Sequence, residues 1–200
     1  PMLPDRLSSD LASLVAGKDR LCLAVEIEVG PGGSVRGKRF IEGVMRSGGK
    51  LTYPGVARAL GLTDEPAKQK EAERRVEMLE TLLELSRLLR KRRLRRGALD
   101  FDLPEAKVVM DESDQEPVDV VRSRKDPGIR DAYRLIEEMM LLANEVVAHE
   151  FTRRGTPVIY RVHGKPDEEK IEVFAELASA LGYDLTPEDA VDPKKLAKFL

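Results

Sequence analysis

The pattern of apolar and polar positions opens with a clear alternation. Between Leu23 and Val29 every second side chain is apolar and the side chains between them are Ala or Glu, which is typical of a strand with one apolar face. Gly30–Ser34 reads Gly-Pro-Gly-Gly-Ser and has turn chemistry, and an extended segment follows from Val35 to about Arg46. These features predict an antiparallel hairpin after a first stretch of loop and short helical turn.

Helical periodicity dominates the remainder. A short helix is expected around Val56–Leu60, and the longest periodic segment predicts one continuous helix over Lys68–Arg96. Asp131 is a plausible N-cap for a helix that runs to about Glu150, and another helix is predicted over Glu168–Leu181. The side chains expected to form the apolar face of the helix after Asp131 are Ile136, Met139, Met140, Ala143 and Val147.

Shorter signals complete the pattern. Apolar runs at 108–110 and 118–121 suggest a second hairpin, residues 158–162 suggest a strand, and an amphipathic helix is expected from Pro193. Strands and helices interleave without regular β-α-β repetition, so the predicted class is α+β. We expect residues 1–200 to form a single domain.

Composition narrows the function classes. The chain has 34 basic and 36 acidic residues and a formal net charge of -2, which excludes a uniformly basic coat for nucleic acid but permits a local basic groove. No apolar run exceeds 5 residues, so no membrane-spanning helix and no membrane partner are expected. A single cysteine, Cys22, excludes an internal disulfide and indicates a reducing, cytoplasmic compartment. The oligomeric state is not indicated.

Familiar catalytic motifs are missing. The sequence contains no phosphate-binding G-x-x-x-x-G-K-[ST] loop, no H-E-x-x-H and no G-x-S-x-G. His149 and His163 fall on different predicted elements, and each is interpreted as a structural group. Cys22 has no base visibly paired with it and is interpreted as a packing residue.

Three segments could carry chemistry. Asp100 and Asp102 would share one face of an extended segment and could seat a hard cation, although a solvated pair beside a turn is the simpler interpretation. The cationic run Arg90–Arg96 could contact phosphates or form a solvated face. Paired glutamates, Glu137 and Glu138, are normally at the surface, and one turned into a groove could accept a hydrogen bond from a sugar hydroxyl.

Five ordered blocks of sequence resemble one family, the RNB catalytic domain of ribonuclease R and ribonuclease II. Together they extend over essentially the whole chain, which makes the resemblance far more specific than a single motif. The blocks are Pro1–Pro4 with Asp19–Leu21, Val44–Ser47 with Lys50–Tyr53, Arg96–Phe101 with Pro104–Glu105, Asp131–Glu145, and Tyr160–His163 with Lys165–Pro166.

The resemblance implies a processive hydrolytic exoribonuclease that degrades single-stranded RNA from its 3′ end and releases nucleoside 5′-monophosphates. It further implies Mg²⁺, which activates water at the scissile phosphate. The aspartate run that binds this metal in the family would precede Pro1, and an arginine motif that supports the reacting phosphate would follow Leu200. Neither is present in this sequence.

The family's motifs carry over to three RNA-binding residues. Phe101 matches an aromatic residue that stacks on the 3′-terminal bases. Tyr53 and Glu137 match residues that favour RNA over DNA, a role that suits a phenol and a carboxylate because both can hydrogen-bond a 2′-hydroxyl.

The resulting interpretation is a central portion of an exoribonuclease catalytic domain, truncated at both ends. It has no catalytic residue and no metal ligand of its own, and we expect the isolated chain to be inactive. The alternative is a non-catalytic RNA-binding or regulatory module that reuses the same fold. A coiled-coil interaction protein is weaker, because the apolar stripe after Lys68 spans too few heptads.

Overall fold

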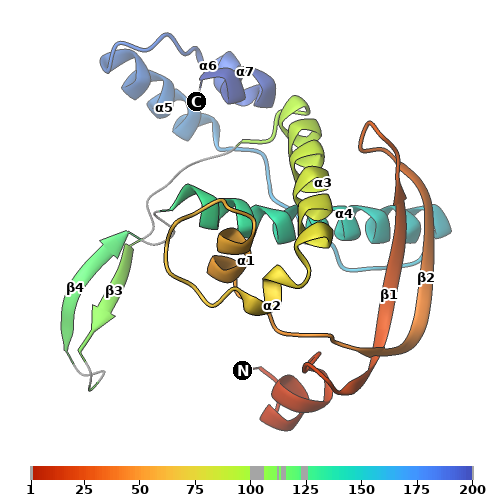
Figure 1. Cartoon of the computed structure of the whole chain (residues 1–200). Helices are drawn as coiled ribbons and strands as arrows, with labels where there is room; N and C mark the ends of the chain where they lie inside the picture. The colour runs from red at the N-terminus through yellow and green to blue at the C-terminus, as the bar shows by residue number, and fades with distance from the viewer. Residues whose placement is uncertain (1, 100–105, 112, 114–115, 123–125, 200) are drawn as a thin grey trace.

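The structure is a computed structural model that describes residues 2–99, 106–111, 113, 116–122 and 126–199. It combines helices with two small antiparallel hairpins, so the predicted α+β class is confirmed (Figure 1). No helix within the described ranges is long and apolar enough to cross a membrane. The elements in chain order are η1 (Arg6–Leu11), β1 (Asp19–Val29), β2 (Val35–Arg46), α1 (Tyr53–Ala59), α2 (Lys70–Glu73), α3 (Val76–Arg95), β3 (Ala106–Met110), β4 (Pro117–Arg122), α4 (Pro127–Arg154), α5 (Glu168–Ala180), α6 (Pro187–Val191) and α7 (Pro193–Phe199).

Both predicted hairpins are present, on opposite sides of α3 and α4 (Figure 1). In the first, Asp19 lies opposite Arg46 at the open end and Val29 lies opposite Val35 beside the turn. Gly33 has a φ of 75°, a left-handed conformation that glycine adopts without steric cost. The Arg92 guanidinium of α3 donates a hydrogen bond to the Gly33 carbonyl, so the hairpin turn is fixed to that helix.

The main core lies where α1, α2 and α3 meet the first turns of α4. Gly128 is essential to this packing, because a Cβ at that position would collide with the backbone carbonyl oxygen of Leu62. The two backbones therefore approach each other more closely than any other residue would allow. The buried members of the cluster are Val56, Ala57, Ala72, Leu79 and Ala132.

The start of α4 differs from the prediction. The helix begins at Pro127 and its N-cap is Asp126, not Asp131. The Asp126 carboxylate accepts hydrogen bonds from the Ile129 N–H at 2.8 Å and from the Thr63 hydroxyl at 2.7 Å. Both bonds hold the pKa of Asp126 below its ordinary value, and the bond from Ile129 has the larger effect. The cap satisfies the first turn and also ties α4 to the loop after α1.

The buried face of α4 also differs from the prediction. Ile136 and Met140, expected in the core, are 42% and 60% exposed. The face that packs against α1 and α3 is instead centred on Ala132 and Leu135, and it includes the charged side chain of Glu138. Met139, Ala143 and Val147, the other members of the predicted face, are half-buried, so apolar character alone misplaced two of its five side chains.

The predicted continuous helix over 68–96 is interrupted. Helix α2 ends at Glu73 and α3 begins at Val76, because Arg75 has a non-helical φ of -127°. The Arg75 guanidinium donates to the Gly48 carbonyl at 2.5 Å and to the Glu71 carbonyl at 2.7 Å. This side chain fixes the break to the segment that follows β2.

The strand predicted at 158–162 is absent, since residues 156–167 form neither helix nor strand. Ile159 is 99% exposed and Val162 is 81% exposed. The chain then enters α5 as predicted, and α5 packs with α6 and α7 into a separate group of helices near the end of α3 (Figure 1). Helix α6 is short and was not predicted. Buried members of this group are Ala178, Leu185 and Ala190.

One carboxylate ties the first hairpin to the far end of α4. Glu150 is 8% exposed and lies 2.9 Å from the Lys38 ammonium of β2. It also accepts hydrogen bonds from Arg153, at 2.6 Å, and from Arg154. Arg153, Lys38 and Arg154 together hold the pKa of Glu150 far below its ordinary value.

The Gly128 contact predicts the effect of a single methyl group. Gly128→Ala should lower the free energy of unfolding by about 1–3 kcal/mol, because the backbone of Leu62 or of α4 must move. Chemical denaturation measures this change. Gly164→Ala is the control, since a Cβ there meets nothing within 4 Å. Equal stability of Gly128→Ala and the unmodified chain would contradict the close approach.

The Glu150 cluster predicts a pH-dependent stability difference. A carboxylate whose pKa is depressed in the folded state stabilises the fold above its unfolded pKa, about 4.3, and loses that contribution as the pH falls further. Glu150→Gln should therefore be less stable than the unmodified chain at pH 7, and this deficit should begin to shrink below about pH 4 and be clearly smaller at pH 3. Denaturant titrations from pH 7 to pH 3 measure the difference.

The control is Glu172→Gln, which alters an exposed α5 glutamate that has no ion pair in the described parts of the chain. It should match the unmodified chain at every pH. A Glu150→Gln deficit that stays constant from pH 7 to pH 3 would contradict the ionic origin of the tether.

Candidate functional site

Two stacked tyrosines join α1 to α4. Tyr53, at the start of α1, packs its ring on Tyr133 of α4 with the ring centroids 3.7 Å apart and the planes 22° from parallel. Thr52 caps α1 by accepting a hydrogen bond from the Gly55 N–H at 3.2 Å, so the sequence Thr-Tyr-Pro fixes Tyr53 at the first helical position. The ring face of Tyr53 is thus occupied by Tyr133, while its hydroxyl has no hydrogen-bond partner among the described residues.

Glu137 lies on α4 one turn beyond Tyr133, and its side chain is 52% exposed. Residues four apart on a helix are neighbours on its surface, so Glu137 neighbours Tyr133 on α4. Of the three residues predicted to bind RNA, Tyr53 therefore stacks on Tyr133, and Glu137 lies one helical turn farther along α4 than Tyr133. The third, Phe101, lies outside the described residues, and its position relative to Glu137 stays untested.

The neighbouring Glu138 was expected at the surface but is only 3% exposed. Its Oε1 accepts two hydrogen bonds from Arg93 of α3, from Nη2 at 2.7 Å and from Nε at 3.1 Å. The same Nη2 also lies 3.3 Å from Oε1 of Glu137. Sequence reasoning missed this pair, although Glu138 falls three residues after the buried Leu135, at helical spacing on the same face.

The cationic run at the end of α3 is divided between two faces. On the inner face Arg92 bonds the Gly33 carbonyl, Arg93 bonds Glu138, and Arg96 pairs with Glu145 at 2.9 Å. Burial, with the nearby charges of Arg134 and Arg93, lowers the pKa of Arg90 below its usual range. The outer cations, spaced four residues apart and without an ion pair in the described ranges, are Arg87, Lys91 and Arg95.

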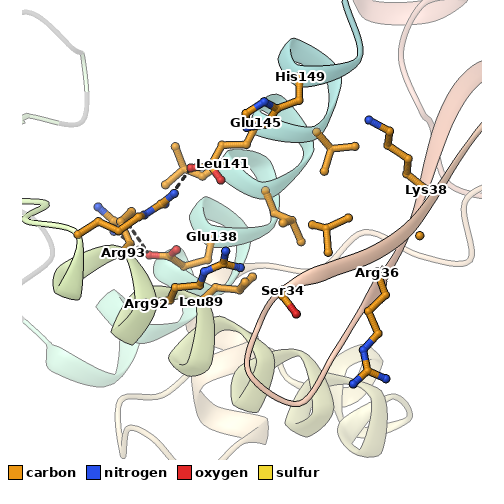
Figure 2. A pocket seen from close by; sticks show the side chains of 15 residues that line it. Ser34, Arg36, Lys38, Leu89, Arg92, Arg93, Glu138, Leu141, Glu145 and His149 are labelled. Atoms are coloured by element: carbon orange, nitrogen blue, oxygen red, sulfur yellow. Dashed lines mark hydrogen bonds and ion pairs between the residues drawn. The ribbon is translucent and has the colours of Figure 1, made fainter. Parts of the chain in front are cut away.

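A pocket of about 470 Å³ opens between β2, α3 and α4. Figure 2 shows Arg93 and Glu138 directed toward each other at its wall, whereas the Arg36 side chain points away from it. His149 lines the same pocket and is exposed, as is His163 in the segment before α5. Cys22 is half-buried on β1.

The described residues do not fit the metal that the family resemblance implies. Within the described ranges no three His, Cys, Asp or Glu side chains gather closely enough to hold an ion. Asp100 and Asp102, the pair considered as a cation site, lie outside those ranges. No metal ligand is assigned to the part of the chain described.

Comparison with known proteins gives a consistent result. Ribonuclease R of Aquifex aeolicus is 38% identical over 199 residues, which cover 100% of this chain and 27% of that relative. Ribonuclease R of Escherichia coli is 34% identical over 200 residues, which cover 100% of this chain and 24% of that relative. The chain thus spans about a quarter of the length of these curated relatives.

Solved structures agree with the sequence comparison. Mycoplasma genitalium RNase R in complex with ribose-methylated single-stranded RNA matches with a TM-score of 0.83 at 27% identity, over 100% of this chain and 30% of that one. The same enzyme in complex with double-stranded RNA also matches with a TM-score of 0.83. The family model of the RNB domain matches residues 1–200, and the chain therefore belongs to the RNB domain family.

Proposed function

We propose that this chain forms part of the RNA-binding surface of a hydrolytic exoribonuclease, which degrades single-stranded RNA from its 3′ end to nucleoside 5′-monophosphates. Membership of the RNB domain family supports the reaction class. The observation that carries the proposal for this chain is that Tyr133, on which Tyr53 stacks, and the half-exposed Glu137 lie on adjacent turns of α4.

These side chains suit a ribose. The Glu137 carboxylate accepts hydrogen bonds, and the Tyr53 hydroxyl can donate or accept one. A 2′-hydroxyl can bond both, whereas DNA offers no such group at that position. The site would thus bind RNA in preference to DNA of the same sequence.

Apolar side chains beside Glu137 suit the rest of a nucleotide. Ile136 and Met140 are 42% and 60% exposed on the same side of α4. Such groups contact bases without regard to sequence, because every base has an apolar face. Phe101 adds to this surface in our proposal by stacking on the terminal bases, a role that rests on family resemblance alone and is worth about 1–3 kcal/mol per base.

The phosphate backbone of RNA would be met by the outer face of α3. Arg87, Lys91 and Arg95 rise along this face by about 6 Å per step and have no ion pair in the described ranges. Unpaired cations attract a polyanion and release its counterions on contact. This electrostatic contribution is the same for ribose and deoxyribose, so the ribose preference is assigned to Glu137 and Tyr53 alone.

Hydrolysis in this proposal requires Mg²⁺, which supplies an activated water and stabilises charge on the reacting phosphate. The described residues offer no metal ligand set, so no chemical step is assigned to them. Their proposed part is to bind and orient the RNA.

The first prediction of this proposal concerns activity. The purified 200-residue chain, mixed with Mg²⁺ and a 5′-labelled single-stranded oligoribonucleotide, should leave the oligonucleotide intact, because the described residues assemble no metal site. Gel electrophoresis and chromatography of the products measure cleavage. Release of nucleoside 5′-monophosphates would contradict the proposal that this chain binds RNA without hydrolysing it.

The second prediction concerns the sugar. Glu137→Gln should weaken the binding of an RNA decamer about tenfold, because the 2′-hydroxyl would then donate to a neutral amide oxygen instead of a charged carboxylate. Binding of the same decamer with 2′-deoxyribose throughout should not change. Fluorescence anisotropy measures both dissociation constants.

A matched control is available on the same helix. Glu145 is 48% exposed, close to the 52% of Glu137, and like it faces an arginine of α3. Glu145→Gln should leave both affinities unchanged. If the two variants behave alike, Glu137 has no special role in reading the sugar.

A further inference from the structure

Arg93 lies between two adjacent carboxylates of different exposure. Its side chain is 21% exposed, and it contacts Glu138, which is 3% exposed, and Glu137, which is 52% exposed. The contact with Glu138 is short and double, through Nη2 at 2.7 Å and Nε at 3.1 Å. The contact with Glu137 is single and longer, at 3.3 Å.

This asymmetry determines which partner holds Arg93. A buried carboxylate requires a charged, hydrogen-bonded partner, and leaving it without one is costly. Glu138 therefore fixes the plane of the guanidinium, whose donors stand in a rigid fork. Since the fork is planar, fixing two of its donors also fixes the direction in which Nη2 meets Glu137.

The Glu137 carboxylate contacts Arg93 but keeps hydrogen-bonding capacity for a ligand. Its Oε1 is the atom near Arg93, and its Oε2 has no hydrogen bond within the described ranges. An ionised carboxylate has about four acceptor sites, so most of its capacity remains for a ligand. An exposed glutamate without such a contact would lose more side-chain freedom when it binds.

We propose that Arg93 is a positioning residue for ribose recognition: anchored by the buried Glu138, it orients the Glu137 carboxylate toward the 2′-hydroxyl of bound RNA. This inference rests on the function proposed above for Glu137. Arg93 and Glu138 would then do more than join α3 to α4. They would also set the direction from which the Glu137 carboxylate meets the ligand.

The test replaces the planar guanidinium of Arg93 with the ammonium group of lysine. Arg93→Lys keeps a cation for Glu138 but cannot hold both carboxylates in one plane. The ratio of the dissociation constants of the deoxyribose and ribose decamers should fall about threefold to tenfold, while the affinity for the deoxyribose decamer stays the same. Fluorescence anisotropy gives the ratio, and thermal unfolding reports on the fold.

Arg96→Lys is the matched control. Arg96 also joins α3 to α4, through Glu145 at 2.9 Å, but has no ion pair with Glu137 among the described residues. It should keep the ribose preference of the unmodified chain. If both variants lost the ribose preference equally, the inference would be overturned. The loss would then come from weaker packing between α3 and α4 and not from the orientation of Glu137.

A double variant separates positioning from direct contact. If Arg93 acts through Glu137, then adding Arg93→Lys to Glu137→Gln should change the ratio no further. An additional loss in the double variant, or an unaltered ratio in Arg93→Lys alone, would overturn the inference and leave the proposed function standing. An unmodified chain without ribose preference would overturn both.

Discussion

The packing of α4 against α1 and α3 is the constraint on which the rest of the structure depends. Its N-terminus is seated where Gly128 meets the Leu62 backbone, its middle is fastened by Glu138 and Arg93, and its end is tied to β2 through Glu150. Each contact fixes the rotation of the helix about its own axis. That rotation decides which side chains are buried, and it leaves the Glu137 side chain 52% exposed.

The sequence predicted correctly those elements whose structure depends on residues close together in the chain. Alternation and a Gly-rich turn predicted the first hairpin, and α5 occupies Glu168–Ala180, one residue short of the predicted range. Prediction was wrong where a distant contact decides. The helix break before α3 falls at Arg75, whose guanidinium bonds the distant Gly48 carbonyl, and residues 158–162 have strand composition without a partner strand in the described ranges.

The same reasoning explains which part of the site was found. Resemblance supplied Tyr53 and Glu137, and the structure adds that Tyr53 stacks on Tyr133, one helical turn before Glu137. Glu138 and Arg93 were missed because charge alone suggests a solvated side chain, and only the paired partner shows that the carboxylate is buried. Ile136 and Met140 were misplaced for the opposite reason, since apolar character alone suggests a buried side chain, whereas the packing of α4 leaves both exposed.

The most direct test of this account is the site of photocross-linking between the chain and a single-stranded RNA decamer that carries 4-thiouridine. Mass spectrometry of the conjugate identifies the attached peptides. Our account predicts attachment at Tyr53 and in the 133–140 segment of α4, with less attachment to the deoxyribose decamer. Attachment confined to the hairpin β3–β4 or to α5–α7, with none at these positions, would contradict it.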